Sequence, residues 1–280
     1  MHPELWRIPI GENGWPLPAF GLMVALGTLL GAFFLGREAR RRGWDSARAI
    51  DIAIWSVMIG LAGARIFYYV QFYDRDFKDE SFLAVFAVWN GGLVLYGGVI
   101  AGVLSLFLLL RRSTFSITDY LDALAPSLAV GISLGRIGCF LNGCCWGKEC
   151  APNAWFAVRF PETSAAGADM AHHLQRIDVP VHPTQIYESV ACLVLAVVLM
   201  LVQRKTSIPG LVASGFFILY GGLRYWIETL RGDHHVTSGG WTVSQIISLG
   251  AIGFGALLAI RCVARYQKTS AEPPNVYSAS

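Results

Sequence analysis

The segment GISLGRIGCFLNGCCWG, Gly131–Gly147, closes an apolar run and begins a polar one. It places Arg136 at the end of the apolar run, and four of the six cysteines of the chain lie inside it or just after it. An ionisable residue at such a position is costly in a membrane and is a functional candidate by default. The segment therefore predicts a membrane helix that leads into a functional site, with Arg136 as its central residue.

The composition is that of an integral membrane protein. Of 280 residues, 54% are hydrophobic and 15% are charged, and the mean hydropathy is +0.49. Soluble domains carry about 25% charged residues. The formal net charge of +3 gives no indication of a nucleic-acid partner, so we expect none.

Seven apolar runs reach the length of roughly 20 residues that a membrane helix needs. We therefore predict an all-α polytopic membrane protein with a single integral membrane domain over 1–265, followed by a disordered cytoplasmic tail over 266–280. The predicted spans are 17–36, 49–72, 92–110, 117–134, 184–202, 211–227 and 242–260.

The distribution of Lys and Arg predicts the orientation, because cytoplasmic loops carry an excess of them. The first loop, 37–48, has five Arg, whereas the second loop, 73–81, is net acidic. The third and fifth loops and the C-terminal end are also basic. The N-terminus is thus predicted on the outer, periplasmic side and the C-terminus in the cytoplasm. The loop of about 45 residues between spans four and five falls outside and is too long for a plain connector.

Unusual polar residues recur at the outer ends of the predicted spans. In span six, Tyr220, Arg224 and Glu228 follow a helical spacing that puts them on one face. Any single Arg here is also explained by snorkelling towards lipid headgroups. Several Arg at one depth favour a shared site for a phosphate, because the guanidinium is a planar fork of donors that stays charged. The outer-end residues are Arg65, Tyr96, Arg136, His182, Gln185, Tyr187, Glu188, Tyr220, Arg224, Glu228 and Arg231.

The motifs around these residues resemble the prolipoprotein diacylglyceryl transferases of bacterial inner membranes, over about 17–249. HPTQIYE, 182–188, resembles a motif of that family, and so do YGGLRYWIETLRGD, 220–233, and GARIFYY, 63–69. The family signature around the opening segment is matched at Asp122, Ala125, Pro126, Gly135, Arg136, Gly138, Phe140, Asn142 and Gly147.

The resemblance implies transfer of a diacylglyceryl group from phosphatidylglycerol to the thiol of a lipobox cysteine in a preprolipoprotein signal peptide, with glycerol phosphate as the leaving group. It implies a multi-pass protein of the bacterial inner membrane and requires no nucleotide, cofactor or metal. Fixed charges would favour the departing phosphate, and a base would generate the nucleophilic thiolate. The expected catalytic residues are Arg136, Arg224, Tyr96, His182 and Glu228, and the expected phosphatidylglycerol-binding residues are Arg136, Arg224, Asn142, Tyr220, Arg65 and Arg231.

Four positions depart from the family pattern, one of which is Phe20 in place of the Tyr of an N-terminal motif. Tyr96 replaces a His that is a usual candidate for the base, Cys139 replaces an Asn, and Cys144 replaces an acidic residue. The identity of the base and of the acceptor therefore stays open. Two other functions remain: a divergent relative that uses another acceptor, and a non-catalytic protein that binds or transports phospholipid.

The outer cysteines have three interpretations. A structural disulfide from Cys150 to Cys144 or Cys145 suits an oxidising compartment. Alternatively, the cysteines are small buried residues in a packed loop, or they form a metal or redox site with His172 or His173, although the spacing lacks a paired C-x-x-C. The sequence leaves the oligomeric state open, and a solvated loop is expected for His234 and His235.

Overall fold

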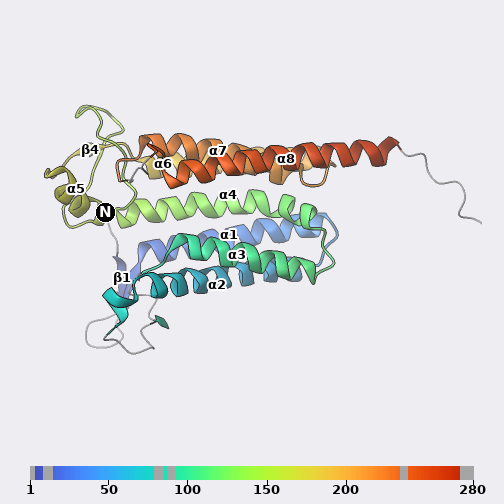
Figure 1. Cartoon of the computed structure of the whole chain (residues 1–280), viewed down its shortest axis with the longest axis horizontal. Coiled ribbons are helices and arrows are strands. Elements are labelled where there is room, and N and C mark those ends of the chain that lie inside the picture. The colour runs from blue at the N-terminus through green and yellow to red at the C-terminus, as the bar shows by residue number, and fades with distance from the viewer. Residues whose placement is uncertain (1–3, 9–14, 79–84, 87–91, 234–238, 272–280) are drawn as a thin grey trace, which may run out of the picture. The chain divides into compact units, whose positions relative to one another are not determined.

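The computed structural model describes residues 4–8, 15–78, 85–86, 92–233 and 239–271 (Figure 1). The fold is mostly helical, as predicted, with two small antiparallel strand pairs. His234, His235 and residues 272–280 lie outside the described residues. The elements are β1 (Glu4–Ile8), β2 (Trp15–Pro18), α1 (Ala19–Arg41), α2 (Ser46–Gln71), η1 (Tyr73–Phe77), α3 (Leu95–Arg111), α4 (Ile117–Asn142), β3 (Val158–Arg159), α5 (Ala165–Leu174), β4 (Pro180–Val181), α6 (Thr184–Lys205), α7 (Leu211–Leu230) and α8 (Val243–Ala271).

Each predicted span coincides with a helix, but the ends differ. Within the described part of the chain, five helices are long and apolar enough to cross a membrane: α1, α2, α4, α6 and α8. Helix α3 is apolar but has 17 residues, and α7 carries the charged residues of the predicted site. Helix α4 continues past Leu134 to Asn142, and α8 continues past Arg265 to Ala271, into the predicted tail.

The chain divides into two compact units, which we call the larger unit (1–31 and 121–280) and the smaller unit (32–120). Their boundaries fall within α1 and within α4. In the larger unit, α4, α6, α7 and α8 run side by side (Figure 1). The first part of α1 approaches α4 closely, since a Cβ placed on Gly27 would lie 3.1 Å from the carbonyl oxygen of Gly131. Small residues that let helix backbones approach are typical of packing in lipid.

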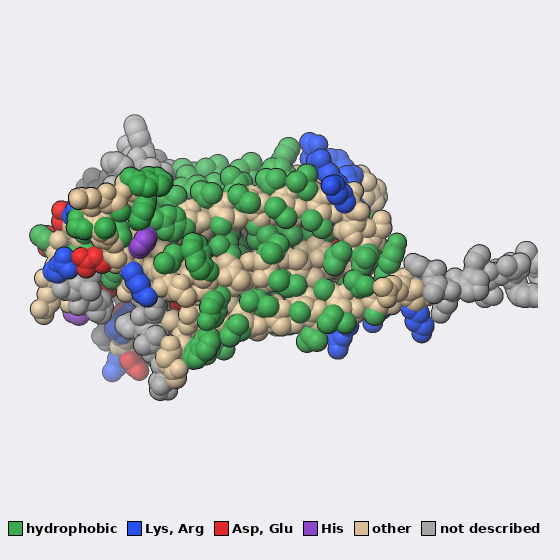
Figure 2. Space-filling view, turned by 90° about the horizontal axis from the view of Figure 1, so that it is seen from above, with side chains coloured by type: hydrophobic (Ala, Val, Ile, Leu, Met, Phe, Trp, Pro, Cys, Tyr) green, Lys and Arg blue, Asp and Glu red, His purple; other side chains and the backbone are tan. Residues whose placement is uncertain are grey.

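In the smaller unit, α2 and α3 also pack closely through glycines. A Cβ on Gly60 would lie 3.1 Å from the carbonyl oxygen of Gly98. The outward-facing side chains are strongly apolar, for example Val70 at 71% and Leu95 at 73% exposure. Figure 2 shows apolar side chains along the helices and charged ones towards the helix ends, which is the surface that a bilayer requires.

The long segment between α4 and α6 is folded. It contains α5 and the β3–β4 pair, which close over a small core of Trp146, Phe160, Ala166, Met170, Val179 and Val181. The indole of Trp146 donates a hydrogen bond to Asp169 over 2.9 Å. This segment lies beside the ends of α4, α6 and α7. A β-bridge pairs its Gly147 with Arg231, just beyond the end of α7.

Candidate functional site

Arg136 and Glu188 form the centre of the candidate site in the larger unit. Helix α4 continues past Leu134, so Arg136 projects from a helix and not from a loop. Its Nε lies 3.0 Å from Oε2 of Glu188 on α6, and the side chain of Glu188 is only 2% exposed. Tyr220 of α7 donates a hydrogen bond to the other oxygen, Oε1, over 3.3 Å. Glu188 therefore joins α4, α6 and α7.

Arg224 extends this network along α7. Its Nη2 lies 2.8 Å from Oε2 of Glu228, one turn further on, and donates to the hydroxyl of Ser244 on α8 over 3.2 Å. The predicted alignment of Tyr220, Arg224 and Glu228 on one helix face is thus confirmed for the Arg224–Glu228 pair.

Arg231 closes the network just beyond the end of α7. Its guanidinium binds both carboxylate oxygens of Asp233 at 2.8 Å, and its Nη1 lies 3.7 Å from Glu228. Burial opposes the charge on Arg231, but the hydrogen bonds to Asp233 outweigh this effect and raise the pKa of Arg231. The side chain stays a cation at any physiological pH.

The network is electrically balanced but not fully hydrogen-bonded. Three guanidinium groups meet three carboxylates, those of Glu188, Glu228 and Asp233. Nη1 of Arg224 is buried without a hydrogen-bond partner among the described residues. Oε2 of Glu188 lies 3.6 Å from this nitrogen, too far for a hydrogen bond. Because a buried unpaired donor is costly, this donor is available to an anionic ligand.

The HPTQIYE motif positions the loop that follows α4. Thr184 donates to the carbonyl oxygen of Cys145 over 2.9 Å, and Gln185 donates to that of Cys144 over 2.6 Å. Both donors lie in the first turn of α6, one turn before Glu188. The motif therefore ties the cysteine loop to the helix that supplies the central carboxylate.

The structure brings together five of the predicted site residues, Arg136, Tyr220, Arg224, Glu228 and Arg231. The other predicted residues lie elsewhere or make separate contacts. His182 stacks on Phe156, and its Nδ1 lies 3.3 Å from the hydroxyl of Tyr187. Asn142 is the last residue of α4.

Arg65 and Tyr96 belong to the smaller unit. Arg65 is buried in the C-terminal part of α2 and donates to the backbone oxygens of Val85 and Gly92, over 2.7 and 3.0 Å. Tyr96 is the second residue of α3 and is 45% exposed. Their predicted roles in the site remain predictions.

Sequence reasoning missed two members of the network, Ser244 and Asp233, and the role of a third, Glu188. Glu188 was recognised in its motif but not as the partner of two Arg residues, because the α4–α6–α7 contact is tertiary. Ser244 carries no signal in the sequence. Asp233 could have been found from its spacing, two residues after Arg231 in RGD.

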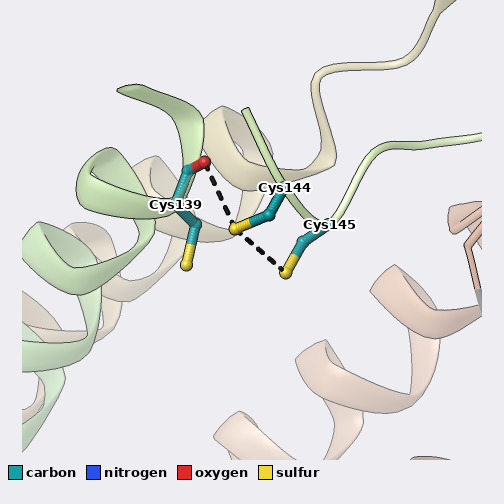
Figure 3. A group of neighbouring side chains, drawn as sticks. All are labelled: Cys139, Cys144 and Cys145. Atoms are coloured by element: carbon teal, nitrogen blue, oxygen red, sulfur yellow. Dashed lines mark hydrogen bonds between the residues drawn. The ribbon is translucent and has the colours of Figure 1, made fainter. Parts of the chain in front are cut away.

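Of the three interpretations of the outer cysteines, the disulfide from Cys150 to Cys144 or Cys145 is wrong, because all six cysteines are free. Cys144 and Cys145 instead turn towards Cys139 at the end of α4 (Figure 3). The backbone amide of Cys150 is bonded to the carbonyl oxygen of Pro180, in the strand pairing beyond the loop. Among the described residues, the cluster comprises these three cysteines and does not include His172. The side chain of His173 lies outside the described part of the structure.

Comparison with known proteins supports one family throughout. The family model for prolipoprotein diacylglyceryl transferase matches residues 9–261. The chain is similar to a phosphatidylglycerol–prolipoprotein diacylglyceryl transferase of Clostridium tetani, with 32% identity over 91% of this chain and 95% of the relative. A second such enzyme, from Clostridium perfringens, is 30% identical over 90% and 94%. One from Salmonella newport is 32% identical over 86% and 87%. The chain therefore belongs to the prolipoprotein diacylglyceryl transferase family.

Proposed function

We propose that this protein transfers the diacylglyceryl group of phosphatidylglycerol to the thiol of a lipobox cysteine in a prolipoprotein, the first step of lipoprotein maturation. The observation that carries the proposal is the buried Arg136–Glu188–Arg224 network with its unused donor on Arg224. In a member of this family, such a donor fits the phosphate oxygen of the lipid substrate.

At carbon, the reaction forms one bond and breaks one. The acceptor thiolate attacks the carbon of the diacylglyceryl group that is bonded to the phosphate oxygen, a carbon–sulfur bond forms, and the carbon–oxygen bond to phosphate breaks. Glycerol phosphate leaves with the bonding electron pair, and the thiol proton passes to a base. The protein must therefore stabilise the departing anion and accept one proton.

Arg136 and Arg224 would stabilise the departing phosphate. Both face Glu188, and both are largely buried. A fixed positive charge in a site with little water stabilises developing negative charge strongly and requires little reorganisation. Glu188 and Glu228 keep the two guanidinium groups oriented before the substrate arrives, because a carboxylate and a guanidinium bond in a defined geometry.

The remaining roles follow the family resemblance. Tyr96 and His182 are the candidates for the base, with Glu228 as an orienting group. Arg65, Asn142, Tyr220 and Arg231 are candidates for contacts with the phosphatidylglycerol headgroup. Tyr220 and Arg231 already contact carboxylates of the network, which supports their assignment more directly than that of the other two.

The membrane arrangement is part of the proposal. We propose that α3 and α7 cross the bilayer together with the five longer apolar helices, so that the chain has seven spans. The five Arg of the loop over 37–48 favour a cytoplasmic location for that loop. The N-terminus, the Arg136 site and the folded 143–183 segment would then face the periplasm, with the C-terminus in the cytoplasm of a bacterial inner membrane.

The test is a transfer assay with the purified full chain, phosphatidylglycerol and a lipobox peptide. We expect a peptide whose mass has increased by one diacylglyceryl group and release of one glycerol phosphate per product. Arg136→Ala should abolish both signals. Arg204→Ala, at the other end of α6 from Glu188, should leave them unchanged.

Two outcomes would contradict the proposal. Absence of the modified peptide with well-folded protein would exclude the prolipoprotein reaction. Release of glycerol phosphate without peptide modification would indicate a different acceptor. Retained turnover in Arg136→Ala would instead remove Arg136 from the catalytic assignment.

A further inference from the structure

Three cysteine side chains converge at the end of α4. The Sγ atoms of Cys139, Cys144 and Cys145 all lie within 4.8 Å of one another. Those of Cys144 and Cys145 are 3.8 Å apart, and Figure 3 shows the three side chains close together. None of them is in a disulfide. The proposed transferase chemistry uses none of them.

This spacing matches a three-thiolate metal site. Zinc–sulfur bonds are about 2.3 Å long, so three sulfurs placed around one ion in a plane are about 4.0 Å apart. A disulfide would engage two sulfurs and leave the third unused. A site that gathers three equivalent soft ligands is better suited to a metal ion, because thiolates select Zn²⁺ and Cu⁺.

The loop that carries two of the ligands is held in place before any ion binds. Gly143 and Cys145 both have left-handed backbone angles, with φ of 68° and 63°. This conformation is unfavourable for a residue such as Cys145 and persists only where the surroundings enforce it. The hydrogen bonds from Thr184 and Gln185 to the carbonyl oxygens of Cys145 and Cys144 supply that constraint.

The local charge suits thiolate ligands. Arg136 and Arg231 both interact electrostatically with Cys145. Their fixed positive charges favour the thiolate form that a metal ligand needs.

We propose that Cys139, Cys144 and Cys145 bind one thiophilic metal ion, Zn²⁺ or Cu⁺, with loss of the three thiol protons on binding. The ion would link the loop after α4 to α4 itself, one helical turn from Arg136. It would thus stabilise the wall of the Arg site in place of the amide and carboxylate side chains expected from the family pattern. The proposal concerns metal binding alone and does not depend on the transfer reaction.

The test uses the purified full chain, reduced with a phosphine and freed of metal. The protein is incubated with Zn²⁺, or in a separate arm with Cu⁺ under anaerobic conditions, and bound metal is quantified after gel filtration. We expect one ion per chain in at least one arm. Cys145→Ser should weaken that binding at least tenfold, whereas Cys150→Ser should not change it. Cys150 is the matched control because it lies on the same outer segment but outside the cluster.

A second measurement uses the unmodified protein and so does not depend on folding of a variant. The thiols are alkylated with and without metal and located by mass spectrometry. Metal should protect Cys139, Cys144 and Cys145 together and leave Cys150 reactive. Failure of the reduced protein to bind either ion would overturn the proposal. Equal binding by Cys145→Ser, or a disulfide within the cluster of the protein as purified from membranes, would do the same.

Discussion

Two arginines with little exposed surface have different partners among the described residues. Arg136, in the larger unit, faces the carboxylate of Glu188 in a network of alternating charges. The hydrogen bonds described for Arg65, in the smaller unit, include two to the carbonyl oxygens of Val85 and Gly92. Its guanidinium also lies over the rings of Tyr68 and Phe77, with centroids at 5.6 and 5.4 Å.

We propose that this difference distinguishes a substrate-binding arginine from one whose main role is structural. Carboxylates can share a guanidinium with an incoming phosphate, because both are anions of similar geometry. Backbone carbonyls are fixed parts of the chain. By donating to those of Val85 and Gly92, Arg65 connects α2 to the segment that precedes α3. The geometry favours substrate binding at Arg136 and Arg224 and a structural role at Arg65. The predictions below test that division.

The largest effect is expected from Glu188→Ala. Removing this carboxylate leaves Arg136 and Arg224 without their shared anion in a buried site, and breaking a buried ion pair costs about 3–5 kcal/mol. We expect a marked fall in the midpoint of thermal unfolding in detergent and loss of transfer activity. Glu149→Ala is the matched control, because Glu149 pairs with Arg176 on the surface, where both side chains are well exposed. An equal loss of stability in both variants would refute the central position of Glu188.

Arg224→Lys should separate activity from stability. Lysine keeps the positive charge but lacks the planar guanidinium of arginine. In Arg224, Nη2 of that group contacts Glu228 and Ser244, while Nη1 stays available for a phosphate oxygen. Loss of one stabilising donor typically lowers kcat by about 10²–10³-fold. We expect a fall of this size in kcat with a smaller change in KM, and Arg204→Lys should behave as the wild type. A change confined to KM would show that Arg224 binds the lipid equally in the ground state and the transition state.

Arg65→Lys should affect stability more than activity, the reverse of Arg224→Lys. Two hydrogen bonds from a charged donor and the contacts with two rings are weakened, and a hydrogen bond to a charged group contributes about 1.5–3 kcal/mol. We expect lower thermal stability with a decrease in kcat far smaller than that of Arg224→Lys. Arg37→Lys, at an exposed position of the smaller unit, serves as the control. A folded Arg65→Lys protein that is inactive would place Arg65 in the active site and end the distinction between the two arginines.

Much of the helical framework could be predicted from the sequence, because long apolar runs have few alternatives in a membrane. The ends were harder. Arg136 suggested that span four stops at Leu134, but α4 continues to Asn142 because Glu188 compensates the charge. That compensation comes from a helix some fifty residues later, and no local pattern encodes it.

The cysteines illustrate the same limit. Composition and compartment favoured a disulfide with Cys150, and spacing alone could not decide among the four outer cysteines. The outcome depends on two side-chain hydrogen bonds, from Thr184 and Gln185, that orient the loop at Cys144 and Cys145. The motif that supplies those donors was recognised, but its role in directing the loop is visible only in three dimensions.

The smallest effect on stability is expected at Asp76, which accepts a hydrogen bond from Tyr68, one of the rings beneath the Arg65 guanidinium. Hydrogen bonds from Arg75 and, to a lesser extent, from Tyr68 lower the pKa of Asp76 to about 2, whereas the pKa of an Asp in an unfolded chain is about 3.9. The stabilisation is therefore fully present above the pKa of the unfolded state, and it is lost as the pH falls through the pKa of the folded state. Asp76→Asn should lower the unfolding midpoint slightly at pH 7, and this gap should close as the pH falls from about 5 towards 2. Because the Arg75–Asp76 pair is accessible to solvent, salt should shrink the gap as well. A gap that exceeds the effect of Arg65→Lys would mean that this surface pair, and not the buried guanidinium, holds the end of α2 in place.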